Sequence, residues 1–192
     1  MTAIDRTAYP RPEARLTREE LGERYHLNDP ELAFIHASAR RDAGRLLLAM
    51  LLKSRRDFGC FAAPGAIHAD TVQHLAAQLG VAPSEASADE MRRTKSLYRY
   101  QAAVRSYLGV KPYDDGAGRF VTGTVLEAAE TMSDPADLIN RAIEALQTAA
   151  IDLPAFSTLD RLVSRLRAEV HGRMYGRVAA RVTAQHAADL RS

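Results

Sequence analysis

The sequence is poor in cysteine and has no long apolar run. Its one cysteine, Cys60, excludes an internal disulfide, and no accompanying histidine motif indicates a reactive thiol. The longest strongly apolar run, Leu46 to Leu52, is far shorter than the roughly 20 residues that span a bilayer. Charged residues and a proline occupy the N-terminus, where a secretory signal needs an apolar stretch. We therefore expect a protein of a reducing cytoplasm.

Catalytic and metal-binding motifs are also missing. The sequence contains no Gly-rich phosphate loop, no HExxH and no CxxC. His68 and His74 are six residues apart, so one helix would not place both on one face, and no neighbouring set of ligands completes a metal site. Asp114-Asp115-Gly116 is not followed by the oxygen ligands of a calcium loop and is interpreted as a polar turn. We expect no enzymatic activity, no cofactor and no metal.

Lysine is scarce among the cations. Of the 26 basic residues three are lysines, Lys53, Lys95 and Lys111, and 23 are arginines. The planar guanidinium of arginine suits phosphate groups and guanine edges. A GC-rich genome would favour arginine codons equally well, so the placement of the charges has to distinguish the two explanations.

The charges are grouped in blocks, although the net charge is only +2. Residues 61–90 hold four acidic and no basic side chains, and residues 91–113 hold six basic and no acidic ones. Residues 114–152 then hold eight acidic side chains against two basic ones. A concentrated positive element between two acidic stretches is the asymmetry that nucleic-acid binding requires.

The spacing of apolar residues predicts an all-α fold. Apolar side chains recur at helical intervals, and no segment alternates polar and apolar residues long enough to indicate a strand. Thr17-Arg18-Glu19-Glu20 is a capping box, and Asp29-Pro30 and Asp134-Pro135 each place a capping carboxylate before a proline. Two helices are expected to end by the same chemistry, at Gly80-Val81-Ala82-Pro83 and at Gly109-Val110-Lys111-Pro112.

The predicted organisation is two small helix-turn-helix-like bundles followed by a long C-terminal helix. The acidic, serine-rich stretch Ser84 to Glu90 is taken as the boundary between them. This gives an N-terminal arm over 1–15, a first DNA-binding subdomain over 16–83 and a second subdomain over 84–192, which holds a basic helix at 89–108 and the long helix at 157–188.

The basic helix is the best candidate contact element. At 100° per residue one face collects apolar side chains, namely Leu97, Tyr100, Val104, Tyr107 and Leu108. Arg93 also belongs to this basic segment, and the opposite face carries Arg92, Lys95, Tyr98, Arg99 and Arg105. No carboxylate lies between Arg92 and Lys111, which leaves the cations free for phosphates or base edges. The alternative is a solvated helix whose arginines pair with the acidic residues between 114 and 144.

A second group of cations flanks the apolar run. Arg40, Arg41 and Arg45 precede it, and Lys53, Arg55 and Arg56 follow it. They are placed either to contact phosphates or simply to solubilise a buried helix. In the last helix Arg161 and Arg165 share a face, as do Arg173, Arg177 and Arg181, and we interpret these as the polar face of a connecting helix.

The order of several motifs resembles the amino-terminal domain of the Tn-three family of replicative transposases. The matching segments are Leu16-Thr17-Arg18-Glu19-Glu20, Tyr25-His26-Leu27-Asn28-Asp29, Arg40 to Leu52, Leu75 to Val81, Arg92-Arg93-Thr94-Lys95, Leu108 to Tyr113, and Leu153-Pro154 with Thr158 to Leu162. Relatives show a His-Asn-Arg-Leu-Gly-Phe run where this chain has Asp42-Ala43-Gly44-Arg45-Leu46-Leu47, so only Arg45 carries over there.

The resemblance implies a pair of helical DNA-binding units that grip the terminal inverted repeats of a transposon, with the catalytic carboxylates in a later domain that this sequence does not include. We therefore expect a sequence-specific, nucleoid-associated module that binds double-stranded DNA and has no catalytic site of its own. Its protein partner would be the remainder of a transposase or a second copy of itself, and no membrane is involved. The alternative is a helical protein-interaction or oligomerisation module of a recombinase.

Overall fold

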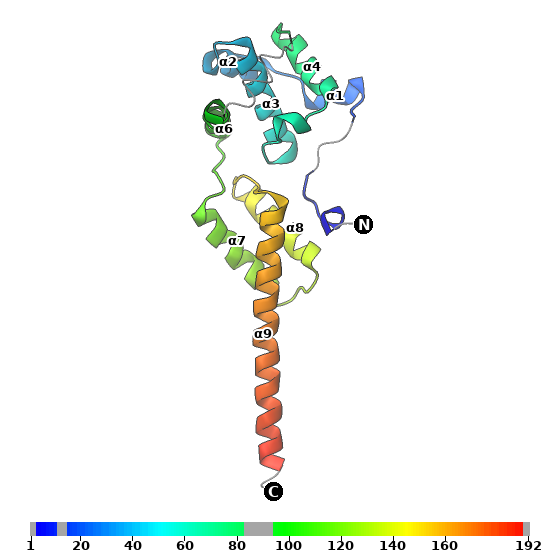
Figure 1. The fold of residues 1–192 in the computed structure, drawn as a ribbon, viewed down its shortest axis with the longest axis vertical. Coiled ribbons are helices and arrows are strands. Elements are labelled where there is room, and N and C mark those ends of the chain that lie inside the picture. The colour runs from blue at the N-terminus through cyan, green and yellow to red at the C-terminus, as the bar shows by residue number, and fades with distance from the viewer. Residues whose placement is uncertain (1–2, 11–14, 83–93, 190–192) are drawn as a thin grey trace. The chain divides into compact units, whose positions relative to one another are not determined.

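A computed structural model describes residues 3–10, 15–82 and 94–189 (Figure 1). Regular secondary structure in these residues is helical, which confirms the predicted all-α class. The chain divides into two compact units. The N-terminal unit comprises residues 10–112, and the C-terminal unit comprises residues 1–9 and 113–192.

This division differs from the expected boundary at Ser84 to Glu90, which lies outside the described residues. The basic helix α6 (Thr94–Leu108) belongs to the N-terminal unit because its apolar face packs on α2 (Asp29–Ser38) and α3 (Asp42–Phe58). Acidic and serine-rich composition indicates a loop but not whether the helices on its two sides separate. The packing of the helices decides whether they separate, and here α4 and α6 both pack on α3 and belong to one unit.

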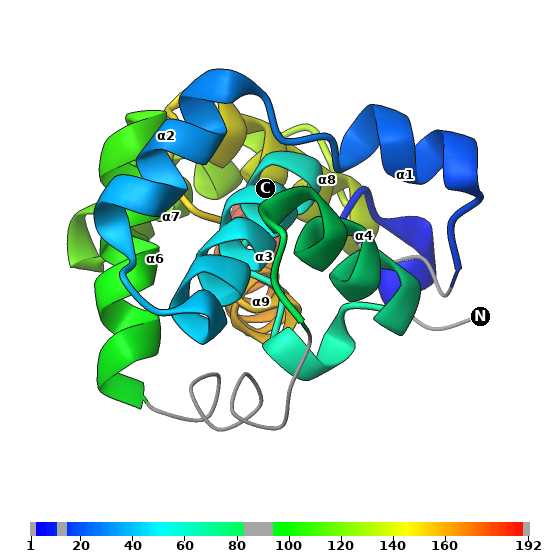
Figure 2. The same ribbon diagram turned by 90° about the horizontal axis from the view of Figure 1, so that it is seen from above.

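The N-terminal unit is built around α3. Figure 2 shows this helix between α2, α4 (Ala69–Leu79) and α6, and all three contact it. Every side chain from Leu46 to Leu52 is at most 1% exposed, so the apolar run that the sequence singled out is the centre of the core. The short helices α1 (Arg18–Arg24) and η2 (Pro64–Ala66) complete the unit.

The predicted helix ends are largely confirmed. Thr17 forms the expected capping box with Glu20 at the start of α1. Gly80 and Gly109 both adopt a φ of 66°, and the following amides of Val81 and Val110 fold back on carbonyls in the last turn, at 3.0 and 2.9 Å. Left-handed backbone of this kind favours glycine, which explains the shared stop chemistry.

The cap of α2 differs from the prediction by one residue. Asn28, not Asp29, is the N-cap: its Oδ1 accepts from the Glu31 amide at 2.9 Å, and Glu31 Oε2 accepts from the Asn28 amide at 3.0 Å. The reciprocal pair needs a carboxylate three residues after the cap, which Asn28 has and Asp29 lacks.

The Glu31 carboxylate also joins α2 to α3. It is fully buried, with Lys53 Nζ 2.8 Å from Oε2 and Arg56 Nη1 2.6 Å from Oε1. A buried carboxylate is tolerated only when it is paired and hydrogen-bonded. Lys53 is itself only 5% exposed, so this pair is part of the core.

The C-terminal unit consists of α7 (Asp115–Ala128), α8 (Pro135–Thr148), α9 (Phe156–Asp189) and the N-terminal turn η1 (Ala3–Arg6). Helices α7, α8 and α9 pack on one another, and α9 extends past the other two (Figure 1). Asp134 caps α8 as predicted. The Ala136 amide and Arg6 hold the pKa of Asp134 below its ordinary value. The last helix begins at Phe156, one residue before the expected start.

Two expectations for this unit were wrong. Asp114-Asp115-Gly116 is the start of α7 and not a free polar turn, because Asp114 Oδ1 accepts from the Ala117 amide at 2.9 Å and caps the helix. The first residues are not a separate arm, because Arg6 pairs with Asp134 and Tyr9 Oη donates to the Pro154 carbonyl at 2.9 Å. The sequence around Asp114 has capping chemistry, but the glycines inside α7 obscured the helix.

Removal of the Lys53 ammonium should destabilise the N-terminal unit strongly. We expect Lys53→Met to lower the free energy of unfolding by about 3 kcal/mol, because it leaves the Glu31 charge buried with one partner fewer. The double variant Glu31→Gln/Lys53→Met keeps a capping acceptor and removes the charge, so it should recover most of that loss. Urea unfolding of both proteins measures this difference. Equal losses in the two variants would show that the ion pair is not the cause.

Gly44 allows α6 to approach α3 closely. A Cβ at this position would overlap the Tyr100 hydroxyl and lie 3.3 Å from Tyr100 Cζ. We expect Gly44→Ala to destabilise the unit by about 1 kcal/mol, since overpacking outweighs the gain in helix propensity. The loss should shrink in a Tyr100→Phe background, which removes the overlapping atom. A double-mutant cycle in urea measures this coupling, and additive effects would argue against the close approach.

Candidate nucleic-acid interface

The two faces of α6 have the characters that its sequence predicts. Tyr100 and Val104 are 4% and 0% exposed, while Leu97, Tyr107 and Leu108 pack against the same core. On the opposite face Lys95 and Arg99 are exposed, and Tyr98 is 64% exposed. Arg92 and Arg93 lie outside the described residues. The part of α6 that is described therefore presents two cations and an aromatic ring to solvent.

The exposed cations of α6 are not neutralised within their own unit. In the described part of residues 10–112, no carboxylate oxygen lies within 4.0 Å of Lys95 or Arg99. The Arg99 guanidinium instead lies 4.8 Å from the centre of the Tyr100 ring. A cation held over an aromatic ring keeps its hydrogen-bond donors available for an anion.

Arg105 does not belong to the open face. Its guanidinium lies 4.9 Å from the centre of the Phe61 ring, and the side chain is half-buried. Phe61 follows α3, far away in the sequence, so the helical wheel of α6 could not reveal this cover. Arg105 is better described as a packing residue with a charged end.

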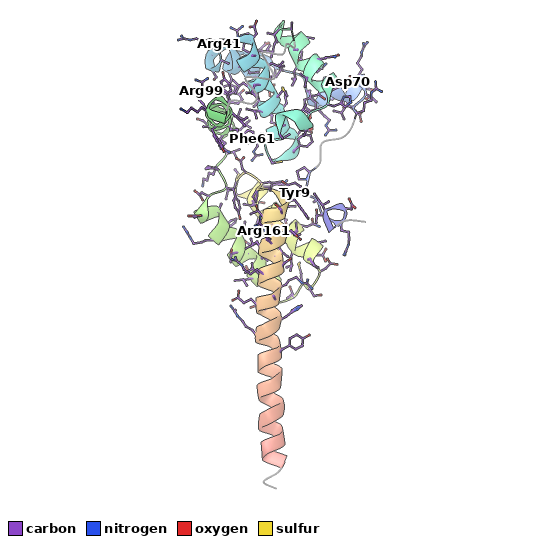
Figure 3. The ribbon with its side chains drawn as sticks, viewed as in Figure 1. Tyr9, Arg41, Phe61, Asp70, Arg99 and Arg161 are labelled. Carbon is purple, nitrogen blue, oxygen red and sulfur yellow. The ribbon has the colours of Figure 1, made fainter. Side chains whose placement is uncertain are left out.

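A basic hollow lies where α2 ends, α3 begins and α6 passes. Its lining residues are Ala37, Ser38, Arg40, Arg41, Ser96, Arg99 and Tyr100. We call this set the basic hollow. Figure 3 shows Arg41 and Arg99, from neighbouring elements, on the same side of the N-terminal unit. The fold thus joins one cation of the predicted basic helix to two from the second predicted group.

The start of α3 lies at this hollow, because its N-cap residue Arg41 is one of the lining residues. Arg41 is the N-cap residue, has extended backbone and makes no side-chain cap. The first amides of a helix have no intrahelical acceptor, and the helix dipole makes this end positive. The hollow therefore combines three guanidinium groups with the hydroxyl-bearing residues Ser38, Ser96 and Tyr100 at the positive end of α3, which suits a phosphate group.

The remaining cations of the second group do not face this hollow. Arg45 donates to the Ala39 carbonyl and to Asp42, each at 3.2 Å. Lys53, expected as a DNA contact, was wrongly placed: it is buried and its ammonium is occupied by Glu31. Arg56 pairs with the same carboxylate, and Arg55 is half-buried and has a partner of its own. The position of these cations beside the apolar run in the sequence therefore did not distinguish buried cations from exposed ones.

In the C-terminal unit a groove between α7 and α9 is lined by the exposed side chains of Arg119, Arg161 and Arg165, together with Asp114 and Asp115. Arg161 and Arg165 thus share a face, as predicted. Burial raises the pKa of Tyr113 at the same groove. Arg173 pairs with Glu169, while the side chains of Arg177 and Arg181 lie outside the description. Cations and carboxylates mix here, so this groove is a weaker anion site than the basic hollow.

His68 and His74 belong to α4 and its N-terminal cap. His68 caps α4, its Nδ1 accepting from the Asp70 amide at 3.2 Å, and burial lowers the pKa of His74. Among the residues that the structure describes, no cluster of His, Cys, Asp or Glu could hold a metal ion. No helix within the same residues is long and apolar enough to cross a membrane.

Comparison with curated protein sequences gives no significant match. Comparison with protein families matches residues 1–166 to the family described as a domain of unknown function, DUF4158. The match covers all of the N-terminal unit and the C-terminal unit as far as the first third of α9. By this match the chain belongs to the DUF4158 family.

Proposed function

We propose that this chain is a sequence-specific DNA-binding module that recognises the terminal inverted repeats of a transposon, as a non-catalytic part of a transposase. The observation that carries the proposal is the convergence of Arg40, Arg41 and Arg99 on one hollow beside the exposed face of α6. Within the described residues no carboxylate forms a salt bridge with these three arginines, and arginines from separate elements that meet in this way suit a polyanion.

The shape of the element supports duplex DNA as that polyanion. Helix α6 is 15 residues long, is anchored along one face by the core and leaves Lys95, Tyr98 and Arg99 outside. A helix presented in this way fits the major groove, with the basic hollow at its N-terminal end facing the backbone. The same residues in a flexible segment would bind phosphates without fixing the position of the protein along the duplex.

The transposon context rests on the order of motifs that resembles the amino-terminal domain of Tn-three family transposases, whereas the description of the matched family names no function. Inverted repeats are the DNA sites on which transposases assemble, so the proposed module would bring its partner domain to the element's ends. Strand cleavage would belong to that partner, because the sequence offers no catalytic constellation.

Loss of the exposed cations should weaken DNA binding and its dependence on salt. We expect the triple variant Arg41→Ala/Lys95→Ala/Arg99→Ala to bind duplex DNA at least tenfold more weakly. The slope of log affinity against log salt should fall by about 0.9 for each phosphate that the variant no longer neutralises. Fluorescence anisotropy at several salt concentrations measures both quantities, with helix content checked by circular dichroism.

The matched control removes three positive charges elsewhere. Arg18, Arg141 and Arg173 are exposed and lie outside the basic hollow, so the triple alanine variant at these positions has the same net charge. It should bind nearly as wild type does. If both triple variants lost affinity equally, binding would reflect overall charge and not this surface.

Sequence specificity can be tested without knowing the site in advance. Selection from a pool of random duplexes with the full chain should enrich a consensus, and that consensus should recur as inverted repeats flanking the gene. A pool that stays unenriched would refute sequence-specific recognition. Self-association by light scattering, without any DNA binding, would favour the alternative of a protein-interaction module.

A further inference from the structure

Tyr100 carries a hydroxyl that the hydrogen bonds of the described residues do not use. The side chain is 4% exposed and lines the basic hollow. Among the described residues its hydroxyl has no hydrogen-bond partner, and its only described polar interaction is that of its ring with Arg99. The Tyr100 side chain lines the hollow, so its unused hydroxyl is a donor for a ligand bound there.

This hydroxyl lies at the first turn of α3. It abuts Gly44, the third residue of the helix, so closely that a Cβ at that position would overlap it. Gly44 therefore brings the Tyr100 hydroxyl against the first turn of α3, whose leading amides precede any possible intrahelical acceptor.

The charges around the basic hollow favour an anion. Arg40, Arg41 and Arg99 line it, together with the hydroxyls of Ser38 and Ser96. An opposing charge, Asp42, lies in the first turn of α3. Its Oδ1 lies 3.2 Å from Arg45 Nη1, which offsets that charge.

We propose that the basic hollow binds one phosphodiester group of the DNA backbone, with the Tyr100 hydroxyl and the first amides of α3 as neutral donors and the three arginines as counter-charges. The proposal rests on the DNA-binding function above and assigns its anchoring contact. A phosphate held at this point fixes where α6 enters the groove while carrying no sequence information itself. Tyr100 is thus a positioning residue for the helix that reads the DNA.

The test separates a neutral donor from a charge. Tyr100→Phe should weaken binding to a duplex by about tenfold while leaving the salt slope and the selected consensus unchanged, because no counterion-releasing charge is removed. Arg99→Ala should lower the slope by about 0.9. Thermal unfolding of Tyr100→Phe should be as in wild type, since the hydroxyl makes no hydrogen bond within the described residues. A stability loss would instead indicate a structural role.

Tyr107→Phe is the matched control on the same helix. Tyr107 stacks on Phe34, with ring centroids 4.2 Å apart, and does not line the basic hollow. It should bind DNA as wild type does. Wild-type affinity in Tyr100→Phe, or the same loss in both variants, would overturn the proposal.

Inorganic phosphate separates this proposal from the DNA-binding function. In the full chain, titration with phosphate should shift the amide resonances of Asp42, Ala43 and Gly44, and Tyr100→Phe should reduce those shifts. Unchanged resonances at these three amides would overturn the phosphate site even if DNA still bound. Shifts in a chain that binds no duplex would overturn both the assignment to DNA and the proposed function, and would leave an anion site that takes free phosphate.

Discussion

The buried carboxylate of Glu31 is the constraint on which the N-terminal unit depends. It closes the capping box of α2 and at the same time receives Lys53 and Arg56 from α3. These partners fix the second helix against the third, and with it the connection that carries Arg40 and Arg41. The geometry of the basic hollow, which contains Arg40 and Arg41 from this connection, therefore depends on the ion pairs that Glu31 forms with α3. A buried charge is uncommon in a protein core because its ion-pair and hydrogen-bond partners together have to offset the free energy of its desolvation.

Much of the fold could be predicted from local chemistry. Capping boxes, prolines at helix starts and the two Gly-Val-x-Pro stops act within a few residues, so the sequence around Thr17, Gly80 and Asp134 was sufficient to place helix ends. The apolar faces of α3 and α6 were equally readable, since helical period alone assigns them. Helix α7 was not predicted because its three glycines, Gly116, Gly118 and Gly123, lower its helix propensity and obscure its apolar periodicity. Tertiary packing nevertheless stabilises this helix.

The candidate site was harder to predict because it is assembled from distant segments. Lys53 and Arg41 looked alike in the sequence, and only the position of Glu31 separates a buried cation from an exposed one. On the helical wheel Arg105 was assigned to the same face as the exposed Lys95 and Arg99, but its guanidinium packs on the Phe61 ring. The one local signal for the hollow was Gly44 in an otherwise well-formed helix, since a glycine there marks close approach by another element. The partner, Tyr100, lies 56 residues later and had been assigned to the core alone.

The contacts of the first nine residues also bear on how the protein is made. Arg6, Ala8 and Tyr9 bond to groups from Asp134, Asn140 and Pro154, so the N-terminal unit is an insertion within the C-terminal one. On the ribosome the inserted unit is contiguous and can fold once residue 112 has emerged, whereas residues 1–9 have to wait until α8 and the start of α9 exist. Residues 1–9 are therefore synthesised before the inserted unit but acquire their native contacts after it.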